Sequence, residues 1–100
     1  MITIYKYPLV LKDHQTIDLP VNHKVLSVGC DGNNQLCMWV QVESNDYVVP
    51  VHFYVIGTGN PMPYYKVDFL GTVRQNSTAL RTVFMWHIFK ECNDDIKKDS

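Results

Sequence analysis

The feature that most constrains this 100-residue sequence is an alternation of apolar and polar side chains, repeated in short runs along the chain. Alternation with a period of two is typical of β-strands, in which successive side chains point to opposite faces. Clusters of turn-forming residues, such as "DGNN", "ESND" and "GTGNPMPY", separate the runs. We therefore predict strands at residues 2–11, 16–19, 24–30, 35–43, 47–56, 66–73 and 81–90.

No part of the sequence shows the apolar spacing of an amphipathic helix. We therefore expect an all-β fold, either a small antiparallel β-sandwich or a partly open barrel of about seven strands. A chain of 100 residues fits one domain. We assign residues 1–90 to a single β domain and residues 91–100 to a polar C-terminal tail.

Composition and charge remove several classes of partner. The chain is 46% hydrophobic and 19% charged, as expected of a globular protein. Nine basic residues are scattered among ten acidic ones, so we expect no binding to duplex nucleic acid, which requires clustered Lys and Arg. No apolar run approaches the roughly 20 residues that span a bilayer, and the N-terminus lacks a basic leader, so we expect no membrane partner.

The cysteines and histidines do not form recognisable metal or disulfide motifs. The three cysteines, Cys30, Cys37 and Cys92, are odd in number, which favours free thiols in a reducing cytoplasm. No histidine lies at a metal-ligand spacing from another histidine or a cysteine. We therefore expect no metal and no cofactor.

Two hairpin registers follow from the apolar pattern. A two-residue turn at Asn45 and Asp46 would place three apolar pairs on one face. These pairs are Val42–Val49, Val40–Val51 and Met38–Phe53. An odd-length loop within "DGNN" would extend this face by placing Leu26, Val28 and Cys30 beside Leu36, Met38 and Val40. A two-residue turn at Asn33 and Asn34 is the alternative, and it would set Cys30 opposite Cys37.

The second face of the predicted sheet carries Trp39, His52 and Tyr54. A solvated face of an antiparallel sheet normally carries Lys, Glu and Thr instead. Either a second layer of strands covers these residues, or they bind a partner. Because Trp and Tyr are enriched at interface hot spots, Trp39, His52 and Tyr54 are our candidate binding residues.

The loop that contains Gly57, Thr58, Gly59 and Asn60 follows an apolar strand, as phosphate-binding loops do. The loop lacks the third glycine and the following helix of a dinucleotide fingerprint, and it lacks the Lys-Ser/Thr pair of a P-loop. Two interpretations remain: its backbone N–H groups form an anion-binding nest, or it is an ordinary connection with glycines at positive φ.

No arrangement of residues predicts catalysis. Cys37 and His52 share the second face, but the sequence offers no third group to orient them. The acidic residues are spread over turns and strand ends, without the pairing that glycosidases need. We therefore predict that the protein is not an enzyme.

The stretches "IYKYPL", "TIDLPVNHKVLSV", "QLCMWVQV", "VIGTGNPMP", "FLGTV" and "FMWHIF" resemble a family of small uncharacterised proteins of tailed bacteriophages. The resemblance covers about residues 2–90, although Asn60 stands where many relatives have a histidine. It implies a phage accessory protein that acts in the cytoplasm of an infected bacterium. By analogy with other small phage proteins, such a protein would neutralise host defence, for example as an anti-CRISPR inhibitor.

Three functions remain open at this point. The chain could bind and inhibit a bacterial host protein through the face of Trp39, His52 and Tyr54. It could instead form a homo-oligomer that sequesters a small nucleotide at the loop of Gly57 to Asn60, or it could be a component of the virion.

Overall fold

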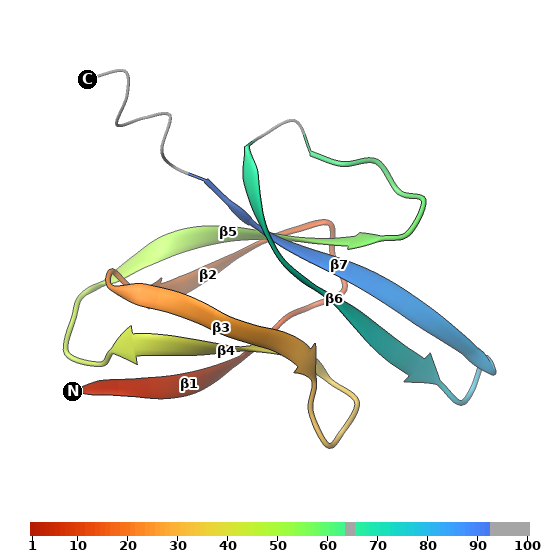
Figure 1. The fold of residues 1–100 in the computed structure, drawn as a ribbon, viewed down its shortest axis with the longest axis horizontal. Helices are drawn as coiled ribbons and strands as arrows, with labels where there is room; N and C mark the ends of the chain where they lie inside the picture. Colours follow the sequence, from red (N-terminus) through yellow and green to blue (C-terminus); the bar gives the residue numbers. More distant parts are fainter. Residues whose placement is uncertain (64–65, 93–100) are drawn as a thin grey trace.

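The structure is a computed structural model that describes residues 1–63 and 66–92. All seven predicted strands are present, and the described residues contain no helix (Figure 1). The strands are β1 (Ile2–Pro8), β2 (His14–Pro20), β3 (His23–Cys30), β4 (Leu36–Glu43), β5 (Val48–Gly57), β6 (Val67–Ser77) and β7 (Thr82–Glu91). Most of the predicted C-terminal tail, residues 93–100, lies outside the described residues.

The strands form two antiparallel sheets (Figure 1). The three-stranded sheet has the order β1-β4-β3, and the four-stranded sheet has the order β2-β5-β7-β6. The two sheets pack on each other in a sandwich-like arrangement without closing into a barrel. The prediction of a small all-β fold is confirmed.

The core lies between the sheets and is built from alternate residues of their central strands. On β4, four side chains point inward, and each is at most 1% exposed: Leu36, Met38, Val40 and Val42. From the four-stranded sheet, Phe53, Val55 and Ile88 meet them, and Leu9 and Leu19 close the core near the strand ends. Burial of these apolar side chains supplies the main driving force for the fold.

The predicted hairpin between β4 and β5 is wrong. The two strands belong to different sheets, and residues 44–47 carry the chain from one sheet to the other. Met38 and Phe53 both lie in the core, as predicted, but they meet across the sandwich instead of side by side in one sheet. A short polar connection permits either a hairpin or a crossing between sheets. The packing of two apolar faces on each other favours the crossing between sheets.

The predicted register of the β3–β4 hairpin is confirmed near its loop. Cys30 pairs with Leu36 and Val28 pairs with Met38, around an odd-length loop at residues 31–35. The alternative two-residue turn is therefore wrong. A bulge between Val25 and Ser27 interrupts the ladder further along, so Leu26 lies outside the predicted pairing and is 44% exposed.

The two sheets approach each other closely where β3 meets β6. A bulge between Phe69 and Gly71 bends β6 at this point, and Gly71 adopts a φ of 152°. A Cβ atom on Gly71 would lie only 2.7 Å from the Cγ2 atom of Val28. Glycine therefore serves two purposes here: it adopts the positive φ, and it leaves room for the neighbouring strand.

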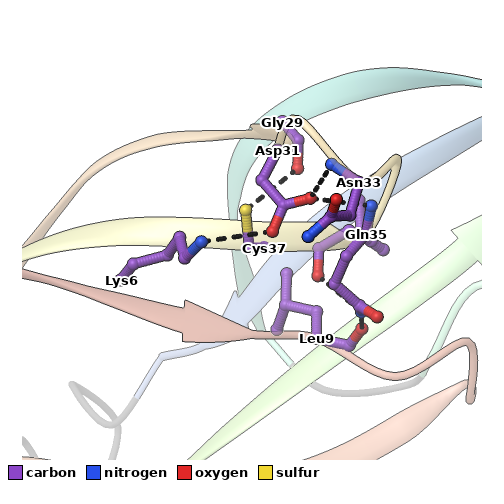
Figure 2. A network of polar contacts seen from close by, with 8 residues as sticks. Lys6, Leu9, Gly29, Asp31, Asn33, Gln35 and Cys37 are labelled. Atoms are coloured by element: carbon purple, nitrogen blue, oxygen red, sulfur yellow. Dashed lines mark hydrogen bonds and ion pairs between the residues drawn. The ribbon is translucent and has the colours of Figure 1, made fainter.

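Asp31 organises a polar network that ties the β3–β4 loop to β1 (Figure 2). Its carboxylate accepts hydrogen bonds from the backbone N–H groups of Asn33 and Gln35, and it pairs with Lys6 of β1 at 3.2 Å. The Gln35 side chain donates to the carbonyl of Leu9, just after β1. The two backbone hydrogen bonds and the Lys6 ammonium hold the pKa of Asp31 below its usual value.

Pro50 lies in a part of β5 that has a neighbouring strand on one side only. Pro50 pairs with Asp18 of β2 on one side, whereas β7 pairs with β5 only from Phe53 onward. Val55 donates its N–H to the carbonyl of Asp13, which places the odd-numbered residues of β5 in the hydrogen bonds to β2. The missing N–H of Pro50 therefore points to the side of β5 that β7 does not reach.

Replacing Gly71 with alanine should destabilise the protein by about 2 kcal/mol or more, because the new Cβ would clash with Val28 and the φ of 152° would be strained. Urea unfolding measures the change. Gly32→Ala is the control and should cost less than about 0.5 kcal/mol, since no atom lies within 4 Å of a Cβ at Gly32. Equal losses for the two variants would contradict this account of β6.

Replacing Asp31 with asparagine should lower the urea midpoint at neutral pH, because the variant loses the charge that Lys6 and two backbone N–H groups stabilise. A carboxyl group whose pKa is lowered by folding contributes stability above its unfolded value of 3.8, and that contribution disappears as the pH falls through the lower folded value. The difference between wild type and variant should thus narrow below pH 3.8. A pH-independent difference would show that the charge of Asp31 is not responsible.

Candidate functional site

Trp39 lies on the face of the three-stranded sheet that points away from the core. Its neighbours on β4, Met38 and Val40, are both 0% exposed, so alternation turns the partly exposed indole outward. The indole rests on Gly29, where a Cβ would lie 3.5 Å from a ring carbon. Because Gly29 has no side chain, the indole ring packs against β3 at this position, with part of its surface in solvent.

Two isoleucines of β1 extend this surface. Ile2 pairs with Glu43 and Ile4 pairs with Gln41, so both side chains share the outward face, where they are 68% and 56% exposed. Lys24 of β3 lies on the other side of Gln41. We call the surface formed by Trp39, Ile2, Ile4, Gln41 and Lys24 the tryptophan face.

The charges around the tryptophan face are partly neutralised within the chain. Lys6 pairs with Asp31, and the N-terminal ammonium of Met1 pairs with Glu43. Both contacts lower the pKa of the carboxyl group concerned. Lys24 forms no ion pair with any of the residues that the structure describes. The face therefore offers apolar side chains together with one unpaired positive charge.

His52 and Tyr54 do not lie with Trp39, because they belong to the outer face of the four-stranded sheet. The sequence interpretation that put the three residues on one surface is wrong, since it assumed the β4–β5 hairpin. Tyr54 is only 5% exposed, and its hydroxyl donates a 2.9 Å hydrogen bond to Glu91. A side chain buried and bonded in this way supports the sheet and is not available to a partner protein.

His52 instead forms a histidine pair with His14 of β2. The His14 Nε2 atom lies 3.0 Å from the His52 Nδ1 atom, and the Thr16 hydroxyl lies 3.1 Å from the same Nδ1 atom. One of the two ring nitrogens must carry the proton and the other must accept it. The two rings border a shallow depression of about 450 Å³, together with Tyr54 and Glu91. Among the described residues, no three potential metal ligands gather here or elsewhere.

The pair of Cys37 and His52 considered from the sequence does not form. Cys37 is 1% exposed within the three-stranded sheet, and its Sγ atom lies 3.6 Å from the Gly29 carbonyl oxygen, to which the thiol donates. Burial raises the pKa of the Cys37 thiol. The two side chains belong to different sheets, so Cys37 has no basic partner in His52.

The loop after β5 forms a tight turn. The Asn60 N–H donates to the Gly57 carbonyl at 3.0 Å, and Gly59 has a φ of 93° while Thr58 does not have a positive φ. This combination is typical of a type II turn, in which the second residue is extended. An anion-binding nest has successive residues in right-handed and left-handed helical conformations, so this turn is not a nest.

The loop nevertheless borders a second depression, of about 450 Å³, against β7. Its wall includes the indole of Trp86 and the ring of Phe84, whose centroids are 5.6 Å apart with planes 25° from parallel. Thr58 also fixes His87, because its hydroxyl lies 2.8 Å from the Nε2 atom. Gly57, Thr58 and Asn60 thus stand beside an aromatic surface.

Several residues of these surfaces are not recognisable as site residues from the sequence alone. His14 does not lie at a metal-ligand spacing in the sequence. Its contact with His52 depends on the pairing of β2 with β5, which the sequence does not reveal. The outward side chains of Ile2 and Ile4 could have been found, since they alternate visibly in the first strand. What could not be seen was that β1 lies beside β4, which places Ile4 diagonally beside Trp39 and Ile2 one side chain further along the same face.

Comparison with known proteins identifies the family. No curated protein and no solved structure matches this chain. No helix in the part of the chain that the structure describes could span a membrane. A family model described as Domain of unknown function (DUF7352) matches residues 1–98, which is nearly the full length. The chain therefore belongs to the family described as Domain of unknown function (DUF7352).

Proposed function

We propose that this chain is a non-enzymatic bacteriophage protein that binds and inhibits a bacterial protein in the cytoplasm of the infected host. The observation that carries the proposal is the tryptophan face, where an indole and two exposed isoleucines occupy the outer surface of a sheet. Tryptophan is the residue most enriched at binding hot spots, and a rim of polar groups around an apolar centre is typical of protein interfaces.

The chemistry of the tryptophan face defines the partner that would fit. The apolar centre calls for a hydrophobic pocket or ridge, and the unpaired ammonium of Lys24 calls for a nearby carboxylate. Gln41, between the apolar side chains and Lys24, is exposed and supplies both a donor and an acceptor. We therefore expect a host protein whose contact surface combines apolar and acidic residues.

The phage origin and the role against host defence are supported by the resemblance of the chain's motifs to small phage proteins. Inhibition of a defence enzyme such as a CRISPR effector needs no catalytic group in the inhibitor, only a surface that covers the target. A single small domain with an exposed apolar face suffices for this purpose.

The aromatic depression beside the β5–β6 loop favours a second function, the sequestration of a small nucleotide. Nucleobases stack on aromatic rings such as those of Trp86 and Phe84, and the neighbouring polar groups of Thr58 and Asn60 could contact a phosphate or ribose. The type II turn offers no preformed anion nest, so phosphate binding would rely on these side chains. For this reason we rank nucleotide sequestration second, after binding to a host protein.

Trp39→Ala should weaken binding to the host protein by about 30-fold or more, which corresponds to the roughly 2 kcal/mol of a hot-spot residue. The partner is first captured from host lysate with the wild-type chain and purified, and the dissociation constant is then measured by calorimetry. Phe69→Ala is the matched control, since Phe69 is an aromatic residue that is 60% exposed on the other sheet. It should leave the affinity unchanged.

Circular dichroism must show that the Trp39→Ala variant is folded. A folded variant that binds as tightly as the wild type would exclude the tryptophan face. A phage that lacks the gene should plate poorly on a host with the relevant defence and normally on a host without it. Detection of the chain in purified particles would instead indicate a virion component.

The nucleotide function predicts a quench of Trp86 fluorescence when cyclic and linear nucleotides are titrated into a Trp39→Phe variant. Because stacking contributes about 1–3 kcal/mol per base, Phe84→Ala should weaken the affinity by about tenfold or more. Calorimetry on the same panel provides the second readout. If no nucleotide produces heat or quenching, the second function is excluded and the first is unaffected.

A further inference from the structure

β1 is an open edge of the three-stranded sheet. It pairs with β4 along seven residues without a bulge, and no other described strand pairs with its far side (Figure 1). The opposite edge of the same sheet, β3, is covered by β6 through the close contact of Gly71 with Val28 and the hydrogen bond from Asn34 to the Asn76 carbonyl. β1 is therefore the edge of this sheet that no other described strand lies against.

The hydrogen bonds at the ends of β1 show which of its backbone groups are free. The Leu9 N–H donates to Leu36, and the Ser44 N–H donates to the Met1 carbonyl. In an antiparallel ladder these bonds alternate, so the odd-numbered residues of β1 bond to β4. The even-numbered residues Ile2, Ile4 and Lys6 consequently direct both N–H and C=O away from the sheet.

From Ile2 to Tyr7, before the terminal Pro8, this edge lacks the features that usually prevent strand pairing. Natural edge strands carry projecting charges, prolines or bulges. In β1, Ile2 and Ile4 are 68% and 56% exposed, and the single charged residue, Lys6, is held by Asp31 instead of projecting along the edge. The edge strand β2 of the other sheet also ends in a proline, Pro20, but it carries the exposed Asp18, which forms no ion pair among the described residues.

We propose that two copies of this chain pair through β1 in an antiparallel arrangement about a two-fold axis, with Ile4 of one copy opposite Ile4 of the other. A two-fold axis is the commonest symmetry of soluble oligomers, and it makes a strand its own partner. In this register Ile2 of each copy lies opposite Lys6 of the other. Each of the three pairs exchanges two backbone hydrogen bonds, so every free N–H and C=O of Ile2, Ile4 and Lys6 is used.

Pro8 favours this register over the register shifted towards Tyr5. Shifting the axis to Tyr5 would place Ile2 opposite Pro8, which has no N–H to donate. Shifting the axis in the other direction would leave Lys6 beyond the end of the second strand. The register centred on Ile4 also keeps the two Lys6 side chains apart, because each faces an isoleucine. A second copy is thus the occupant whose backbone groups match this edge one for one.

The pairing would join the sheets of two copies into one, in the order β3-β4-β1-β1-β4-β3. Since the axis is perpendicular to the sheet, both tryptophan faces would lie on the same side and form one larger surface. That consequence rests on the proposed function, whereas the pairing itself does not. Self-association is measured on the purified chain alone, so either idea can fail without the other.

Light scattering after size exclusion should give twice the monomer mass of 11.6 kDa, with a dimer that dissociates on dilution. Ile4→Lys should weaken dimerisation by about a hundredfold, since it sets two ammonium groups opposite each other and removes the apolar contact. Leu26→Lys is the matched control: it changes a 44% exposed leucine on the other edge strand and should leave the dimer intact. Circular dichroism confirms folding of both variants.

Cross-linking tests the register with cysteine variants in a Cys30→Ser, Cys92→Ser background. Opposite residues of a hydrogen-bonded pair have Cα atoms about 5.5 Å apart, within disulfide range. Ile4→Cys should therefore form a covalent dimer on oxidation. Ile2→Cys should not, because its equivalents would be about 13 Å apart along the strand. A wild-type chain that stays monomeric up to about 1 mM, or a dimer indifferent to Ile4→Lys, overturns the proposal.

Discussion

The packing of β4 against β5 across the sandwich is the interaction on which the rest of the structure depends. The inward side chains of β4 are all but completely buried, and Phe53 of β5, also 0% exposed, lies against them. Because β4 is the central strand of its sheet, it holds β1 on one side and β3 on the other. The outer surface of that sheet, including Trp39 and the edge at β1, is placed by this one layer of apolar contacts.

The packing of β4 against β5 also shows which features of the fold could be predicted from the sequence and which could not. Alternation identifies which side chains of β4 and β5 turn inward, and Met38 and Phe53 do share a core as predicted. Alternation does not distinguish two strands that pair side by side from two that face each other, because both arrangements bury the same residues. The choice depends on long-range packing, which a four-residue connection such as 44–47 leaves open.

The arrangement of β4 and β5 determines which of the candidate site residues lie on the same surface. A hairpin would have placed Trp39 and Tyr54 on one surface, whereas a sandwich turns them to opposite outer faces. Tyr54 then contacts Glu91 and the His14 ring, while Trp39 shares its face with Ile4, diagonally beside it, and with Ile2 further along β1. Of the two interpretations left open for the loop at Gly57 to Asn60, the conformation agrees with a turn that has a glycine, Gly59, at positive φ, a requirement that is local and therefore visible in the sequence.

The two free edge strands, β1 and β2, both end in a proline and differ instead in their charges. In β5, Pro50 lies where no strand needs its N–H, and in β2, Pro20 ends an edge that also carries the charge of Asp18. In β1, Pro8 likewise occupies the last position, but Ile2 and Ile4 are apolar and the one charged residue, Lys6, is paired with Asp31. A strand edge that is apolar, regular and unprotected is a ready template for pairing with another strand. Among the described strands β3 and β6 lie against each other, so β1 and β2 are the open edges, and β1, whose one charged residue is paired, is the edge beside the tryptophan face.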